Sequence, residues 1–192
     1  MNLMTLVRMN RSYRRFDESH NIKGQVLLEL VQLALYSPTG NNMQPLKFWL
    51  SNTPEKNELI FPHLGWAGSL KEWKGPKEGE RPSAYIIILG DKDIQFNFGV
   101  DHGIAAQSIM LGAAEKGLGG CMIGSAKRDG LRKDLGIPEQ YKILLVLALG
   151  KPIETVVTEP LKTDGEIRYY RDAEGVHHVP KRSLDELIVR DV

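Results

Sequence analysis

Apolar residues recur at helical spacing in several stretches of the chain. In residues 24–36 they stand at positions i, i+3 and i+4, which predicts an amphipathic helix with one buried face. Shorter helices are predicted over residues 3–9, 55–61 and 127–135. Residues 99–117 are apolar or small on nearly every side. We therefore expect this helix to be buried all round, in the middle of the domain or at a subunit interface.

Other stretches have the pattern of strands. Residues 84–90 and 143–149 are continuous apolar runs, which is typical of strands buried on both faces. Residues 47–51 alternate between apolar and polar, and residues 121–123 form a short apolar run after a series of glycines. Further along, we expect a turn at residues 163–165, a hairpin around residues 173–175 and a C-terminal helix. Ser183 and Glu186 have the spacing of a capping box for that helix.

Length and composition set the broad class. The 192 residues suit a single domain spanning residues 1–192, and 42% hydrophobic with 26% charged residues is ordinary for a globular protein. A net charge of +1 favours neither a nucleic-acid partner nor a membrane surface. The single cysteine, Cys121, excludes an internal disulfide. Since the sequence has neither a signal-peptide pattern nor an apolar run of membrane-spanning length, we expect a cytoplasmic protein.

The most distinctive polar stretch is residues 37–45 (SPTGNNMQP), between the helix predicted at 24–36 and the strand predicted at 47–51. We call it the junction. Because both neighbours are apolar, the junction is expected at the edge of the core, where its amides and hydroxyls need partners. A polar planar ligand could supply them. A simple turn remains the alternative.

A second candidate is the basic cluster at residues 11–15, which contains Arg11, Ser12, Arg14 and Arg15. The planar fork of arginine fits phosphate oxygens, and a serine hydroxyl can add a donor. A solvated surface patch is the alternative. Residues 62–83 form a long irregular stretch that holds Trp66 and Trp73. These rings could stack on a flat substrate, or they could anchor the loop to the core.

Several other residues invite a functional interpretation that the pattern does not favour. His177 and His178 are adjacent, so on a strand they face opposite sides, and they lack a third metal ligand. Cys121 lies in an apolar segment and is expected to be a buried, inert thiol. Asp101 is expected to cap the helix of residues 99–117. The glycines of residues 117–124 follow a helix and precede a strand, which is the reverse of a dinucleotide-binding loop.

Four blocks of sequence together resemble the FMN-dependent nitroreductase family. They are RSYRRFD at residues 11–17, the junction, the helix ending in GLGGC at residues 117–121, and Lys181-Arg182 near the C-terminus. They follow the family's order along nearly the whole chain. The resemblance implies an α+β fold with a central mixed sheet flanked by helices, built as an intertwined homodimer with FMN at each subunit interface. It also implies electron transfer from NADH or NADPH to nitroaromatic, quinone or related small-molecule acceptors, by alternating half-reactions.

The resemblance also assigns site residues to this sequence. Arg11, Ser12 and Arg14 fall where the family binds the FMN phosphate, and Lys181 and Arg182 fall on its C-terminal basic pair. The remaining positions that it places around the flavin ring are Pro38, Thr39, Asn42, Gln44, Gly124 and Ser125. Trp66 and Trp73 are candidates for the acceptor pocket. Two other functions remain open: the same fold with a different flavin reaction (fragmentation, dehalogenation or dehydrogenation), or a flavin-binding module without turnover.

Overall fold

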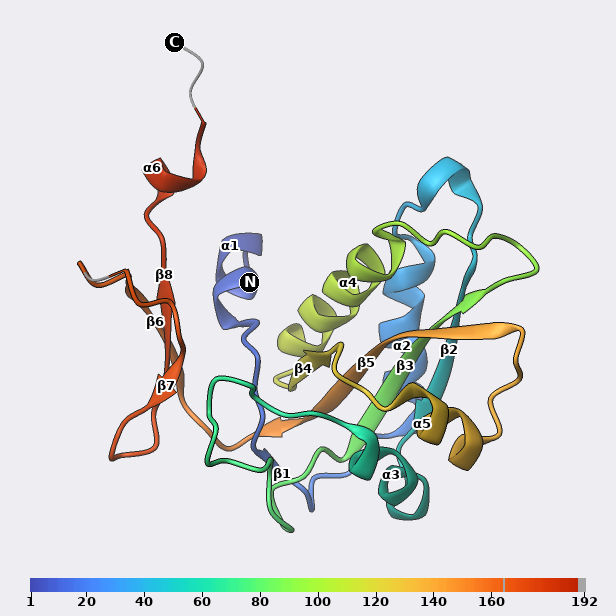
Figure 1. Cartoon of the computed structure of the whole chain (residues 1–192), viewed down its shortest axis with the longest axis horizontal. Coiled ribbons are helices and arrows are strands. Elements are labelled where there is room, and N and C mark those ends of the chain that lie inside the picture. Colours follow the sequence, from blue (N-terminus) through green and yellow to red (C-terminus); the bar gives the residue numbers. More distant parts are fainter. Residues whose placement is uncertain (164, 190–192) are drawn as a thin grey trace.

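A β-sheet sandwiched between two layers of helices forms the body of the protein (Figure 1). A C-terminal arm, described over residues 156–163 and 165–189, extends away from the body. The computed structural model describes residues 1–163 and 165–189. Asp164, the central residue of the turn expected at residues 163–165, lies outside the described residues. No helix within the described ranges is long and apolar enough to cross a membrane.

The main sheet is built around β5 (Tyr141–Pro152), which pairs along its length with β3 (Ala84–Asp91) and β4 (Gly119–Ile123). β2 (Leu46–Ser51) pairs with β3, and the two-residue β1 (Phe16–Asp17) pairs with the end of β5. All these pairs are antiparallel. The mixed character expected of this sheet rests, among the described residues, on the parallel bridge between Ser12 and Gly120.

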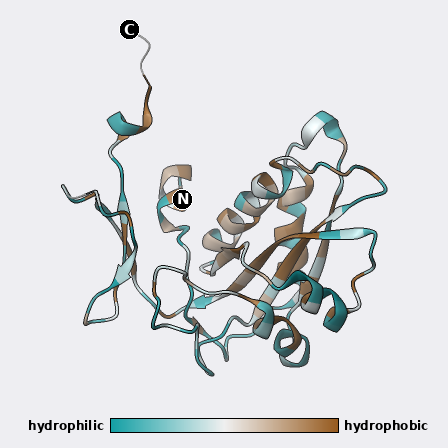
Figure 2. Ribbon diagram, viewed as in Figure 1, coloured by the Kyte–Doolittle hydropathy of each residue, from teal (hydrophilic) through white to brown (hydrophobic). Residues whose placement is uncertain are grey.

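The alternation of side chains along the strands creates two cores. On one face, Ile86 and Ile88 of β3 pack with α2 (Gly24–Leu35) and α4 (Asp101–Glu115). On the other face, Ile87 packs with α3 (Pro54–Ile60) and α5 (Arg128–Leu135). β3 is buried along its whole length, as its continuous apolar sequence predicted. Figure 2 shows this as hydrophobic colour concentrated on the strands and on the helices beside them.

α4 is less enclosed than its composition predicted. Its small residues face α2 and the sheet, where Gly112 lies so close to Leu33 that an added Cβ would sit 2.2 Å from a side-chain carbon. Gly103, Gln107 and Glu115 are exposed, however, so one stripe of α4 is not covered within this chain. One chain therefore does not bury α4 on all sides, and its burial at a subunit interface stays a prediction.

The C-terminal arm carries a second, small sheet. In it β8 (His177–Lys181) pairs in parallel with β6 (Val156–Pro160) and antiparallel with β7 (Tyr170–Arg171). The β7–β8 pair is the hairpin expected around residues 173–175. The final helix, α6 (Leu184–Leu187), begins with the predicted capping box between Ser183 and Glu186. At the other terminus α1 (Leu3–Met9) has no buried residue.

Candidate functional site

The basic cluster is held against the edge of β4. Ser12 bridges to Gly120, and the Tyr13 amide donates to the Gly120 carbonyl at 2.9 Å. The Arg11 guanidinium donates through Nη2 to the carbonyl of Val7 at 2.6 Å, whereas its Nε is buried without a hydrogen-bond partner. A buried donor without a partner is uncommon. Arg11 therefore has an unused donor at the place where the sequence predicts a phosphate.

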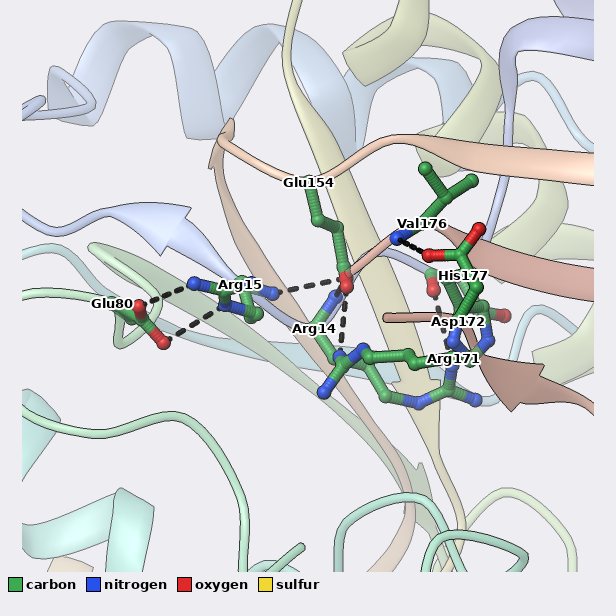
Figure 3. A network of polar contacts seen from close by, with 9 residues as sticks. Arg14, Arg15, Glu80, Glu154, Arg171, Asp172, Val176 and His177 are labelled. Atoms are coloured by element: carbon green, nitrogen blue, oxygen red, sulfur yellow. Dashed lines mark hydrogen bonds and ion pairs between the residues drawn. The ribbon is translucent and has the colours of Figure 1, made fainter. Parts of the chain in front are cut away.

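A buried carboxylate organises the chain behind this cluster. The side chain of Glu154 is 1% exposed and accepts hydrogen bonds from the backbone amides of Arg14 and Arg15 (Figure 3). Its second oxygen accepts from Nη2 of Arg171, in the arm, at 2.8 Å. Arg15 itself is used in a two-bond pair with Glu80, at 3.0 and 2.6 Å. Glu154 thus fixes the backbone that carries Arg14 and connects it to the arm.

The Arg14 side chain contacts the arm directly. Its Nη1 lies 3.3 Å from Nε2 of His177, and its guanidinium lies over the ring of Tyr169, 4.9 Å from the centroid. Burial, together with the charge of Arg14, lowers the pKa of His177 to about 4. At neutral pH the imidazole is therefore uncharged, and its Nε2 can accept a hydrogen bond from Arg14. The Arg14 side chain forms no ion pair with a carboxylate among the described residues.

The junction has an unusual backbone. Asn41, Asn42 and Gln44 have φ values of 49°, 55° and 51°, in the left-handed region that few residues other than glycine adopt. Such a cluster of strained residues is found most often at functional sites. The amide side chains of Asn42 and Gln44 are exposed, as is Pro38. This backbone favours a functional site over a simple turn.

Contacts from α4 and from within the junction hold this conformation. The buried carboxylate of Asp101 accepts a hydrogen bond from the Gly40 amide at 3.0 Å, and Thr39 Oγ1 accepts from the Gln44 amide at 3.1 Å. Asp101 was expected to cap α4, but the capping position is Val100, and Asp101 is the first helical residue. Its carboxylate is turned towards the junction instead. Thr39 and Gln44 also line an apolar cleft of about 410 Å³ beside α2 and β2.

The end of β4 presents an open backbone position. Gly124 is exposed, and nothing lies within 4 Å of where its Cβ would be. Ser125 is tied to the loop of residues 62–83, because its hydroxyl donates to the Gly65 carbonyl at 2.9 Å and its own carbonyl accepts from the Gly65 amide at 2.7 Å. In the same strand Cys121 is 5% exposed, and burial raises the pKa of its thiol, as expected of an inert cysteine.

Lys181 and Arg182 lie at the outer part of the arm. Arg182 pairs with Glu186 at 3.2 Å, and both basic residues line a shallow cleft of about 420 Å³. Within residues 1–163 and 165–189, no hydrogen bond or ion pair joins Lys181 or Arg182 to the basic cluster. The single chain thus does not bring the two basic groups into contact.

The two tryptophans are held by other residues. Trp66 packs against Phe61 with a centroid distance of 5.9 Å and contributes to the core below α3 and α5. The centroid of the Trp73 ring lies 4.3 Å from Cζ of Arg171. These contacts favour the anchoring alternative. The assignment of both rings to an acceptor pocket stays a prediction.

Figure 1 shows how these parts are arranged. The basic cluster, β4 and the start of the arm lie together, whereas the junction, between α2 and β2, lies at the far end of the body. Three residues important to this arrangement were not anticipated as such: Glu154, His177 and Asp101. Each acts on a residue at least 61 positions away in sequence, so no local pattern identifies it.

Comparison with known proteins supports the sequence resemblance. The model of the nitroreductase family matches residues 7–151, which include the basic cluster, the junction and the end of β4. The chain belongs to the nitroreductase family. The match ends at residue 151, before the strands of the arm, so the shared pattern does not describe the arm.

Individual members of the nitroreductase family are similar to this chain in sequence or fold. A Bacillus subtilis protein described as an NAD(P)H nitroreductase, YodC, is 22% identical over 183 residues, covering 80% of this chain and 91% of that protein. A nitroreductase family protein of Clostridium difficile 630 has the same fold, with a TM-score of 0.70 and 18% identity over 100% of this chain and 99% of that one. A nitroreductase of Exiguobacterium sibiricum, solved in complex with FMN, gives a TM-score of 0.65 at 19% identity over 80% of this chain and 90% of that one.

Proposed function

We propose that this protein is an FMN-dependent oxidoreductase that transfers electrons from NADH or NADPH to nitroaromatic, quinone or related small-molecule acceptors. The observation that carries the proposal is the basic cluster at the edge of β4, where Arg11 has a buried donor without a partner. Two relatives support the chemistry: one is described as an NAD(P)H nitroreductase, and another was solved with FMN.

The residues present fit a flavin mononucleotide. Arg11, Ser12 and Arg14 would hold the phosphate, since Arg11 and Arg14 form no ion pair with a carboxylate within the described part of the chain. His177 keeps its imidazole neutral beside Arg14, so that it orients the guanidinium without adding a competing charge. At the end of β4, the space beside Gly124 lets a planar ring approach the backbone.

Asn42 and Gln44 would meet the polar edge of the flavin ring. Their amides are exposed on a strained backbone that Asp101 and Thr39 hold in place, so they are oriented before any ligand binds. Donors at that edge stabilise negative charge. FMN, when bound, would supply the redox chemistry, while the chain would bind it and orient it.

A homodimer would complete the site. In Figure 1 the junction and the basic cluster lie at different ends of the body, which favours a site in which a partner supplies one of them. The exposed apolar residues of α1 and of the end of α2 provide a surface for such a partner; they include Leu3, Met4, Leu35 and Tyr36. The arm would then wrap around the partner, and Lys181 and Arg182 would approach the phosphate of a bound FMN. For Arg182 this requires giving up an exposed pair with Glu186 that contributes little to stability.

Steady-state turnover tests the proposal. We expect the purified protein to retain FMN and to oxidise NADH or NADPH rapidly only when a nitroarene or a quinone is added. An Arg11→Gln variant should lose FMN and turnover together, because the unpartnered donor and its charge are removed. Slow oxidation that does not depend on the acceptor would instead indicate a flavin-binding module without turnover.

A further inference from the structure

A second cleft, with a volume of about 490 Å³, lies between α3, the connection from β1 to α2 and the start of β3. These elements meet at the bottom of the view in Figure 1, at the end of the body opposite the junction. None of the residues that line the cleft belongs to the proposed flavin site. Its volume is in the range of known small-molecule sites.

Three residues that line this cleft each have a buried polar atom without a hydrogen-bond partner. These atoms are the Tyr85 hydroxyl, the Ser83 hydroxyl and Nε of Arg81, at alternate positions leading into β3. Tyr85 is 1% exposed and Ser83 is 7% exposed. Nearly all buried polar groups in proteins have a hydrogen-bond partner, so three orphans among the residues of one cleft point to a ligand with acceptor atoms.

The three groups can all act as donors. Burial raises the pKa of Tyr85 far above its ordinary value, so the phenol keeps its proton. The Arg81 guanidinium lies over the ring of Phe61, 4.5 Å from the centroid, and forms no ion pair within the described residues. A cation and two hydroxyl donors are the groups that bind a carboxylate.

The same cleft also carries negative charge. Glu18 lines it and accepts from the backbone amides of Gly79 and Arg81, both through Oε2, so that Oε1 has no hydrogen bond within the described residues. Glu58 lines it from α3 and is exposed. A ligand with only a carboxylate would be repelled by these two groups, whereas an ammonium group would complement them.

We propose that this cleft binds a small zwitterion, a free amino acid. Its carboxylate accepts hydrogen bonds from Arg81, Ser83 and Tyr85, and its ammonium group faces Glu18 and Glu58. Phe61, Pro54 and Pro82 provide apolar walls for the side chain of the ligand.

Three probes with the same aromatic body separate the two charges: L-phenylalanine, 3-phenylpropanoate without the ammonium group, and phenethylamine without the carboxylate. Each is titrated into the purified full-length chain by isothermal calorimetry. We expect L-phenylalanine to bind, and each of the other two to bind at least about tenfold more weakly, because each loses a set of charge-assisted contacts. No binding of L-phenylalanine would overturn the proposal, and equal affinity for 3-phenylpropanoate would overturn the zwitterion.

Variants of the lining place the binding in this cleft. Tyr85→Phe and Arg81→Met should each weaken L-phenylalanine binding by about ten- to hundredfold, since each removes a contact to a charged group. Tyr141→Phe makes the same change on β5, outside the cleft, and should bind like the parent. Ser83→Ala serves if either lining variant does not fold. Flavin content should stay at the parental level in all of them. Parental affinity in the lining variants would overturn the proposal.

Discussion

Replacing Glu154 with glutamine should destabilise the protein, because this carboxylate connects the basic cluster to the arm. Its side chain is 1% exposed and accepts from two backbone amides and from Arg171. In Glu154→Gln the remaining oxygen can still accept hydrogen bonds from the backbone amides. The new NH₂ group is a donor, however, and it faces the donors of Arg171, which loses its acceptor. Removing one partner of a buried ion pair costs about 3–5 kcal/mol. Because the Arg171 side chain keeps 15% exposure, we expect the lower end, about 3 kcal/mol.

Urea unfolding at one fixed protein concentration measures this loss. With an m-value of about 2 kcal/mol/M, the midpoint should fall by about 1.5 M. The control is Glu29→Gln, which breaks the exposed pair between Glu29 and Lys116 and should leave the midpoint close to that of the parent. A midpoint for Glu154→Gln that matches the control would refute the role given to Glu154.

Four further predictions follow from the site and the arm. Arg182→Ala should weaken FMN binding by about ten- to hundredfold and leave riboflavin binding unchanged, and equal losses for both ligands would exclude a phosphate contact. Asn42→Ala should change the flavin midpoint potential, and a parental potential would exclude its contact with the ring. Hydrogen bonds to Asp172 and Glu159 raise the pKa of His178. These bonds therefore stabilise the fold at acid pH, and the stabilisation is lost as the pH rises through the raised pKa. The melting temperature of His178→Gln should lack this pH dependence. Sedimentation at micromolar concentration should show a dimer, and a well-dispersed monomer would contradict it.

The main elements of the body could be predicted from hydrophobic periodicity. α1 was predicted with its observed bounds, and α2 and β3 to within one residue, because each has a long apolar pattern. β1 and β7 have two residues each, and their pairing depends on β5 and β8, which are distant in sequence or joined through a turn. Such short strands have no periodicity from which they could be recognised.

The site could be predicted only where a local motif carries it. The unpartnered donor of Arg11 and the strained backbone of Asn42 lie within the stretches that their composition singled out. The role of His177 could not be predicted, because an adjacent pair of histidines gives no sign that one is buried against Arg14 and the other is paired with Asp172 and Glu159. Lys181 and Arg182 lie in the arm without a contact to the basic cluster among the described residues, so their place at the phosphate stays a prediction.

The most direct test of the central claim follows the visible absorbance of the FMN-loaded protein without oxygen. If the protein is an FMN-dependent oxidoreductase, adding NADH or NADPH should bleach that absorbance rapidly, and one equivalent of a nitroarene or quinone should then restore it. The Arg11→Gln variant should show little bound FMN at the same concentrations. Stable absorbance after both nicotinamides have been added, in protein that still holds FMN, would contradict the account.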